Sequence, residues 1–446
     1  MSNTEAEPRS PSRGSHHICV PFASEAHYKE CMADVTKYRT YLTEVAQHHP
    51  ELFPQALAQG YWFHARYHVR KPDVSLRRIK LKATGAVFTL RPSFLLPYGI
   101  GRTAEVENAL FLRQWGVPFA ALASVFGRNA MFWYRAWLSF GRPNLVGTTV
   151  KHAATMPQDV VADEKITWLA GNEVVVPTTV GGGCVLGISL SEQSDSPSLQ
   201  ATYGEFVSEA HAVFPAYGVR SVCTDGFQAT RDAWRQLVPH LILVLCFLHA
   251  ILKLTERCRG ALRCRVLGRA WHVYQAVTKA QFAQRLRRLA EWARTSLEGS
   301  LALTVEKTAR HREDFTPAYD CPLAARTTNA VDRVHNHLDR TLYAMQYCHG
   351  HQASARLAVR TWALLWNFHP YSLRLRQHRP ARSSPFDERA RRPGGWHWRP
   401  CASAPPARAP HRTADAPTGA GCGRARPPRR VAGRSRSWRG ATAGSR

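Results

Sequence analysis

The chain between residues 151 and 257 alternates between short apolar runs and longer amphipathic segments. Three apolar runs come first, at 160–169, 172–180 and 182–191, and the glycines at 181–183 suit a hairpin turn. After these runs, the patterns predict helices at 198–214 and 227–238 and strands at 219–225 and 240–247. Strands that alternate with helices in this way predict an α/β domain, in which side chains at strand ends converge on one site.

The order of these elements also suggests a topology. Three antiparallel strands followed by helix, strand, helix and strand is the order of an RNase H-like fold. We therefore expect an α/β, RNase H-like core whose first part covers residues 151–257 and whose last part covers residues 321–386. Residues 258–320, between the two parts, are basic and carry apolar residues at helical spacing, which predicts an α-helical insertion.

A small basic module with a disordered start is predicted to precede the core, within residues 1–105. Residues 25–68 look helical and are rich in aromatic residues. Residues 76–90 alternate between apolar and polar like a hairpin, with Gly85 at the turn.

Residues 106–150 show a pattern of helix, glycine turn and helix. One helix ends at Gly116, a second runs from Pro118 to Phe126, and a third begins at Asn129. This arrangement can lay a recognition helix in the major groove of DNA. The expected DNA contacts are Arg128, Asn129, Arg135 and Arg142. Because the third helix is heavily aromatic, a purely packed helical subdomain stays open as the alternative.

The last segment, residues 387–446, contains no Leu, Ile, Phe, Tyr or Lys, but it contains 14 Arg and 3 acidic residues. A segment of this composition cannot bury a core, so we expect it to be disordered. Its Arg/Pro/Ala/Gly/Ser composition is also typical of a GC-rich gene translated out of frame. A frameshift or truncation product and a basic tail that binds DNA phosphates are the two interpretations.

The charge of the chain indicates its partners. The formal net charge is +28, of which residues 387–446 carry +11, so residues 1–386 carry +17. Such a body attracts polyanions, and we expect nucleic acid as the partner. We expect no membrane segment, because proline, histidine and lysine interrupt the longest apolar stretch, residues 237–254. The absence of an apolar signal core and of any C-x-x-C pair favours a cytoplasmic, nucleoid-associated protein with reduced thiols.

Two aspartates in the predicted sheet carry candidate chemistry. Asp163 lies in the middle of the first strand, and Asp225 follows the fourth strand, immediately before Gly226. Adjacent strands would bring the two carboxylates together, where they repel unless a cation neutralises them. Mg²⁺ suits such a site because it keeps water ligands and bridges phosphate oxygens. A simple turn role for Asp225 is the alternative, whereas Asp163 within an apolar strand is costly without a partner.

Three segments, "CTDGFQATRDAWRQLVPHLILVLCFLHAILKLTERCR", "ARTTNAVDRVHNHLDRTLYAMQYCHG" and "WALLWNFHPY", carry a family resemblance. Together they resemble the core of DDE-type bacterial insertion-sequence transposases of the Mutator-like group, over residues 106–386. The resemblance implies an enzyme that binds double-stranded DNA at element ends and target and works as a homo-oligomer on that DNA. It also implies two Mg²⁺ ions, for which Mn²⁺ can substitute.

The third carboxylate follows from the resemblance. In related transposases a Thr-Asn pair precedes a glutamate on a helix, and here the pair ends at Asn329 and places Asp332 at that position. The implied catalytic residues and metal ligands are Asp163, Asp225 and Asp332. Because an aspartate is one methylene shorter than a glutamate, and misplacement by about 1 Å can cost on the order of 100-fold in rate, Asp339 on the same helical face is the alternative. We expect Asn329 to cap this helix or to orient the site.

The C-x-x-H motif of the family corresponds to Cys246 and His249. The resemblance implies that both line the active site, with His249 near the scissile phosphate. A zinc site would need two more ligands, for which Cys258 and Cys264 are the candidates.

The expected function is metal-dependent DNA cleavage and strand transfer, with water as the nucleophile for cleavage and a DNA 3′-hydroxyl for joining. One alternative is a catalytically decayed or domesticated transposase that only binds DNA. A second alternative is a nuclease of the same fold without joining activity.

Overall fold

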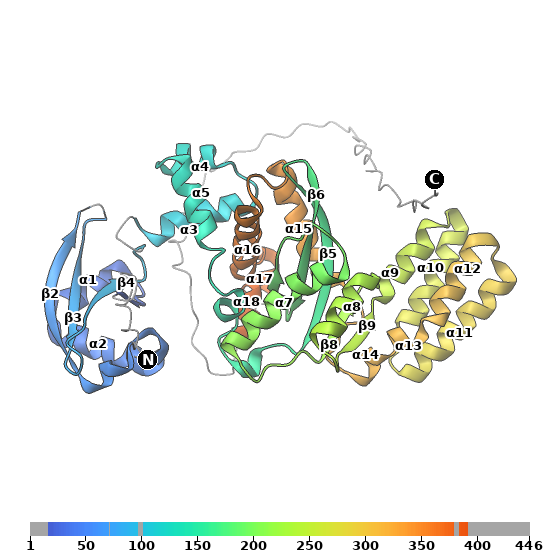
Figure 1. Cartoon of the computed structure of the whole chain (residues 1–446), viewed down its shortest axis with the longest axis horizontal. Helices are drawn as coiled ribbons and strands as arrows, with labels where there is room; N and C mark the ends of the chain where they lie inside the picture. Colours follow the sequence, from blue (N-terminus) through green and yellow to red (C-terminus); the bar gives the residue numbers. More distant parts are fainter. Residues whose placement is uncertain (1–16, 71, 97–100, 379–382, 391–446) are drawn as a thin grey trace, which may run out of the picture. The chain divides into compact units, whose positions relative to one another are not determined.

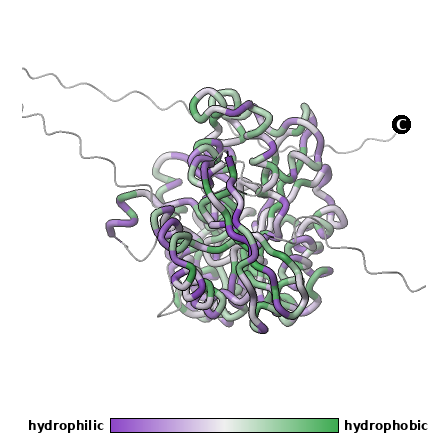
Figure 2. The backbone as a smooth tube through the Cα atoms, turned by 90° about the vertical axis from the view of Figure 1, so that its left-hand side faces the viewer, coloured by the Kyte–Doolittle hydropathy of each residue, from purple (hydrophilic) through white to green (hydrophobic). Residues whose placement is uncertain are grey.

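The computed structural model describes residues 17–70, 72–96, 101–378 and 383–390, which form a mixed α/β protein with two sheets and many helices (Figure 1). Hydrophilic and hydrophobic residues are interleaved along the backbone (Figure 2). Among the described residues, none of the helices combines the length and the apolar character needed to cross a bilayer.

The N-terminal module is built on a four-stranded sheet of order β1-β4-β3-β2. Its elements are β1 (His17–Val20), α1 (Glu25–Ala33), α2 (Val35–His48), the 3-10 helices η2 (Pro50–Leu52) and η3 (Gln55–Gln59), β2 (Tyr61–Val69), β3 (Val74–Leu81) and β4 (Val87–Pro92). Helices α1 and α2 share a hydrophobic core with the sheet, in which Tyr38 and Leu42 meet Ile79 and Leu90.

The predictions for this module were partly correct. The hairpin expected at 76–90 is present as β3 and β4, and Gly85 has the positive φ of +66° that its turn requires. The helix expected to continue to residue 68 is wrong, because residues Tyr61–Val69 form strand β2. The alternation of β2 is masked in the sequence by aromatic residues at consecutive positions and by a β-bulge between Phe63 and Ala65.

Four helices follow: α3 (Thr103–Gln114), α4 (Phe119–Phe126), α5 (Ala130–Ser139) and α6 (Leu145–Thr149). The predicted turns lie between them, and Gly116 and Gly127 have φ values of +86° and +69°. A Cβ added to Gly116 would lie 2.4 Å from the Cβ of Ala344, so this turn also needs glycine for close packing. Trp133 and Trp137 of α5 are buried in the same core as the central sheet, so these aromatic residues are packing residues.

The five-stranded central sheet has the order β7-β6-β5-β8-β9. Its strands are β5 (Asp159–Leu169), β6 (Asn172–Gly181), β7 (Cys184–Ile188), β8 (Ser221–Thr224) and β9 (Ile242–Leu245). The short 3-10 helix η5 (Ala153–Thr155) precedes them, and α7 (Ser196–Val213) and α8 (Gln228–Leu237) connect β7 to β8 and β8 to β9. Strands β5, β6 and β7 pair antiparallel, whereas β8 is parallel to both β5 and β9. All the elements predicted between residues 160 and 247 are therefore confirmed.

Helices cover both faces of this sheet. Helices α7 and α8 pack on one face, where Tyr203 and Trp234 contact the core side chains of β5 and β8. The other face packs against α15 (Asn329–Ala344) and α16 (Gln352–Phe368), which contribute Leu338 and Trp362. Strand β5 is thus the middle strand of the middle layer, and its residues Val160–Ala162 are buried, whereas Ile166 and Trp168 nearer its end are exposed.

The segment after β9 is helical, as predicted, and has its own core. It contains α9 (Phe247–Glu256), α10 (Gly260–Tyr274), α11 (Lys279–Ser296), α12 (Gly299–Arg310), α13 (Arg312–Phe315) and α14 (Pro317–Asp320). Phe247 and Ile251 of α9 belong to this core, so the insertion fixes the helix that carries His249.

The chain described after α16 contains α17 (Leu373–His378) and α18 (Pro385–Ala390). Helix α18 includes residues that the sequence assigned to the tail, and Phe386 is buried against Phe368 with ring centroids 4.6 Å apart. The rest of the predicted tail, residues 391–446, lies outside the described residues.

Candidate functional site

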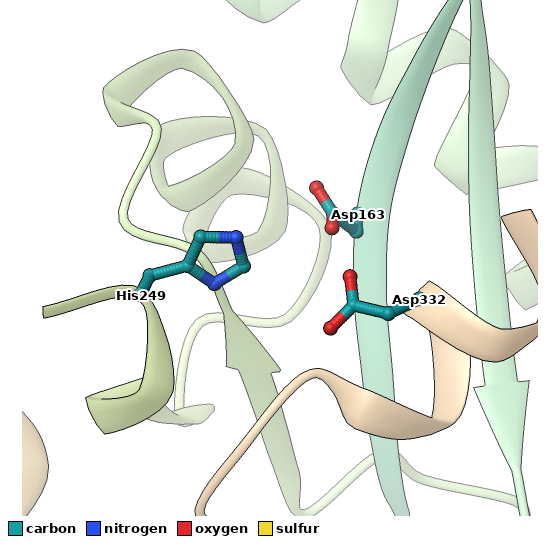
Figure 3. Close-up of side chains that lie close together, drawn as sticks. All are labelled: Asp163, His249 and Asp332. Atoms are coloured by element: carbon teal, nitrogen blue, oxygen red, sulfur yellow. The ribbon is translucent and has the colours of Figure 1, made fainter. Parts of the chain in front are cut away.

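The candidate site is centred on Asp163 in strand β5. Two sets of side chains bring their possible metal-ligand atoms within 4.8 Å of one another: Asp163, Glu164 and Asp225 form one set, and Asp163, His249 and Asp332 form the other. Asp163 belongs to both sets, so residues from β5, the end of β8, α9 and α15 meet at its carboxylate. Figure 3 shows Asp163 and Asp332 with their carboxylates facing one another and the imidazole of His249 directed toward them.

The environment of Asp163 concentrates negative charge. Burial, followed by the carboxylates of Asp225 and Glu164, raises the pKa of Asp163 to about 8. The backbone N–H of Glu164 donates to Oδ1 of Asp163 at 2.9 Å and fixes the orientation of the carboxylate. The site therefore holds more carboxylates than the protein neutralises by itself.

Asp225 lies directly after β8, as predicted, and it also has the turn role that was the alternative. Its Oδ1 accepts a hydrogen bond from the backbone N–H of Phe227 at 2.8 Å. Gly226 has a φ of +97°, and a Cβ added there would lie 2.5 Å from Cδ1 of Leu245. The glycine thus allows the chain to turn tightly against β9 while the aspartate faces Asp163.

Glu164 is part of the site, although it was missed in the sequence. Its Oε1 accepts hydrogen bonds from the hydroxyl groups of Tyr203 on α7 and Thr230 on α8. Burial raises the pKa of Glu164 to about 7. Neighbouring residues on a strand point to opposite faces, so the strand pattern alone does not place Glu164 beside Asp163. The available signal was a second acidic residue within the same apolar strand.

Asp332 lies in the first turn of α15, and its Oδ2 accepts a hydrogen bond from the Thr328 hydroxyl at 3.2 Å. Burial raises the pKa of this carboxyl group. The alternative residue, Asp339, instead forms an ion pair with Lys165, with Nζ and Oδ2 2.9 Å apart. Asp339 belongs to neither ligand set found among the described residues. The geometry therefore favours Asp332 over Asp339 as the third carboxylate.

Cys246 and His249 lie beside these carboxylates and share a partner. The backbone N–H of Thr328 donates to Sγ of Cys246 at 3.2 Å, and Nδ1 of His249 lies 3.3 Å from the Thr328 hydroxyl. A hydrogen bond from the thiol of Cys223 lowers the pKa of Cys246; burial opposes this effect, and a hydrogen bond with His249 lowers the pKa further. Hydrogen bonding to Cys246 in turn raises the pKa of His249, so this pair favours a thiolate beside an imidazolium.

The zinc interpretation of the C-x-x-H motif finds no support in the described part of the chain. The Sγ of Cys258 is buried and donates to the carbonyl oxygen of Leu254 at 3.2 Å, whereas Cys264 is exposed. Neither residue joins Cys246 in a group of possible metal ligands.

The role expected for Asn329 was partly wrong. Thr328, not Asn329, occupies the N-cap position of α15, and Asn329 is exposed in the first turn. Asn329 belongs to neither ligand set of the described chain. Thr328 occupies the N-cap and site-orienting position expected for Asn329. Its hydroxyl contacts Cys246, His249 and Asp332.

The four residues expected to contact DNA have different surroundings. Asn129 caps α5, since its Oδ1 accepts the backbone N–H of Phe132 at 2.7 Å. Arg128 has a φ of +66°, and its guanidinium lies 5.1 Å from the Phe132 ring centroid. Arg128, Arg135 and Arg142 are all exposed, so each guanidinium group is accessible to an anionic partner.

Comparison of the chain with protein-family models gave no match, and comparison with curated proteins gave none either.

The side chains of the site fit a divalent cation. Carboxylate oxygens are the ligands that hard cations such as Mg²⁺, Mn²⁺ and Ca²⁺ prefer. Burial, with a smaller effect of the Asp225 carboxylate, raises the pKa of Asp163 and Asp332, and a bound cation would offset this cost of keeping both carboxylates charged. The acidic clusters around Asp163 are thus able to bind a metal.

Proposed function

We propose that this protein is a DNA transposase with an RNase H-like core, which catalyses metal-dependent cleavage and strand transfer at the ends of an insertion sequence. The observation that carries the proposal is the position of Asp163, whose carboxylate lies within 4.8 Å of a carboxylate oxygen of Asp332 and of Asp225. The strand order β7-β6-β5-β8-β9, with parallel β5, β8 and β9, supports an RNase H-like core.

Asp163, Asp225 and Asp332 would hold a pair of Mg²⁺ ions. When bound, such ions activate the attacking oxygen and stabilise the leaving oxygen of a phosphodiester. The protein orients each carboxylate through a hydrogen bond to one of its oxygens, donated by the Glu164 N–H, the Phe227 N–H and the Thr328 hydroxyl respectively. The second oxygen of each group can then face the cations.

In this proposal Thr328 acts as a positioning residue, and His249 contacts the substrate. The Thr328 hydroxyl touches both Asp332 and His249, so it ties the carboxylate on α15 to the imidazole on α9. A protonated His249 beside the carboxylates also offers a hydrogen-bond donor to a phosphate oxygen of the substrate.

Double-stranded DNA is the proposed substrate, bound by a homo-oligomer. The net charge of +17 on residues 1–386 favours a polyanion, and Arg135 and Arg142 offer exposed guanidinium groups for the phosphates.

A plasmid cleavage assay tests the proposal. The substrate is a supercoiled plasmid that carries the element with its natural flanking DNA, incubated with the full chain in Mg²⁺ or in EDTA. We expect strand breaks at the element ends in Mg²⁺ only, and none with Asp163→Asn. Glu173→Gln, which removes an exposed carboxylate from the neighbouring strand β6, is the matched control and should cleave normally. Cleavage in EDTA, or full activity of Asp163→Asn, would exclude the proposed chemistry.

A further inference from the structure

The N-terminal module has an uneven distribution of charge. Residues 61–96, which contain β2, β3 and β4, include 8 Lys or Arg and 1 acidic residue. Residues 17–60, which contain α1 and α2, include 3 Lys or Arg and 5 acidic residues. The sheet strands are therefore strongly basic, while the helical part of the same module is slightly acidic.

Two of the basic side chains, Arg78 and Lys80, lie on the sheet face opposite the helices, whereas Arg77 is buried on the helix side. Ile79 faces the core that α1 and α2 share with the sheet, so its neighbours Arg78 and Lys80 point the other way. Cross-strand partners share a face, and Lys80 is paired with Trp62 while Arg78 is paired with Thr89. The guanidinium of Arg78 lies 4.7 Å from the ring centroid of Tyr67, which places Tyr67 on the same open face.

This open face is hollowed and carries exposed aromatic surface. A hollow of about 520 Å³ is lined by basic and aromatic side chains, among them His17, Tyr67, Arg70, Arg78 and Arg91. The acidic residue of these strands, Asp73, is paired with His68 at 3.2 Å. Next to the hollow along β2, the indole of Trp62 is 54% exposed, and the Lys82 ammonium lies 5.3 Å from its ring centroid.

We propose that this open face, which we define by Trp62, Tyr67, Arg78, Lys80 and Arg91, binds single-stranded DNA. Basic groups that follow a phosphate backbone, combined with aromatic rings on which bases stack, are the features of single-strand binding surfaces. Charge complementarity disfavours the Arg-rich segment 387–446 of this chain as the occupant.

The inference goes beyond the proposed transposase activity and does not depend on it. The face lies on a module with its own hydrophobic core, and none of the residues that define it belongs to the metal-ligand sets. In a strand-transfer enzyme, such a face would hold the DNA strand that cleavage separates from its complement.

Fluorescence anisotropy with the full chain tests the inference. The probe is a labelled oligothymidylate, titrated in EDTA over a range of salt concentrations, so that cleavage does not contribute. Arg78→Gln/Lys80→Gln removes two charges from the open face. Lys29→Gln/Lys37→Gln removes two exposed charges from α1 and α2 and is the matched control.

Each lost phosphate contact should lower the slope of log K against log salt by about 0.7 for a single strand. We therefore expect a slope smaller by about 1.4 for Arg78→Gln/Lys80→Gln and an unchanged slope for the control pair. Trp62→Ala should weaken binding about tenfold with the slope unchanged, because it removes stacking and no charge. Thermal melting by circular dichroism verifies that each variant is folded.

Two further probes decide the identity of the ligand. A duplex of the same length should lose less affinity than the single strand in both the Trp62 and the Arg78/Lys80 variants. Equal losses for the test and control pairs, or no effect of Trp62→Ala, would overturn the proposal. Losses confined to duplex DNA or to a single-stranded RNA of the same length would also overturn it.

Discussion

The ligand oxygens of Asp163 and Asp332 lie within 4.8 Å of one another, although one residue is in the middle of β5 and the other is in the first turn of α15. In the sequence, the whole helical insertion lies between these two elements. The contact is set by hydrophobic packing, because Val331, Val334 and Leu338 of α15 are buried against the sheet. The chemistry of the site therefore depends on how accurately α15 is seated.

The turn between α3 and α4 is one support of α15. Gly116→Ala would place a Cβ 2.4 Å from the Cβ of Ala344, the last residue of α15, at a φ of +86°. We expect a loss of about 2–4 kcal/mol in the free energy of unfolding from strain and overpacking. Gly127→Ala has a similar φ of +69° and nothing within 4 Å, so it should lose about 1 kcal/mol. Urea denaturation measures both, and equal losses would show that the contact with Ala344 is unimportant.

The hydrogen bonds of Glu164 predict a difference between two substitutions. Glu164→Ala leaves the hydroxyl groups of Tyr203 and Thr230 without their acceptor and should cost about 2–3 kcal/mol. Glu164→Gln keeps an acceptor oxygen and should cost clearly less. Denaturation in EDTA separates this effect from metal binding. If both variants lost the same stability, the hydroxyl groups of Tyr203 and Thr230 would have to donate their hydrogen bonds to other acceptors.

A buried histidine predicts a dependence of stability on pH. Burial, with a smaller effect of Lys165, lowers the pKa of His335 from 6.5 to about 3, and its Nε2 has no hydrogen-bond partner among the described residues. Between these pKa values the unfolded state binds the proton and the folded state does not, so stability falls as the pH falls below about 6.5. At pH 5 the cost should be about 2 kcal/mol.

The variant His335→Leu should remove this dependence. Relative to wild type, it should gain stability on going from pH 8 to pH 5, as measured by urea denaturation at the two pH values. A constant difference between the two proteins would mean that His335 does not titrate with folding.

The end of the described chain predicts where truncation becomes harmful. Removal of residues 391–446 should leave the melting temperature unchanged, because that segment contains no Leu, Ile or Phe to contribute to a core. Phe386→Ala should destabilise the protein by about 3 kcal/mol, since Phe386 is buried against Phe368. A large fall in melting temperature on truncation after Ala390 would show that the removed segment supports the fold.

Much of the fold and the centre of the site could be predicted from the sequence. Apolar runs identified β5 and β8 with Asp163 and Asp225, because a charged residue within or directly after such a run is conspicuous. Strand β2 could not be predicted, because aromatic residues lie on both of its faces and a bulge breaks its alternation. The roles of Glu164 and Thr328 depend on contacts with α7, α8 and α9, which local periodicity does not encode.

The choice between Asp332 and Asp339 as the third carboxylate depends on both the sequence and the structure. The family resemblance pointed to Asp332, and spacing along the helix left Asp339 as an alternative. In the structure Asp332 lies near Asp163 and His249, whereas Asp339 is paired with Lys165, and this geometry favours Asp332.

The most direct test of the account compares Asp332→Asn with Asp339→Asn in the Mg²⁺-dependent plasmid cleavage assay. We expect Asp332→Asn to abolish cleavage and leave DNA binding intact, because it removes a charge that the cations require. Asp332→Glu should remain active. Asp339→Asn should remain active as well, since it loses only a partly exposed ion pair with Lys165. An inactive Asp339→Asn together with an active Asp332→Asn would contradict the proposed metal site.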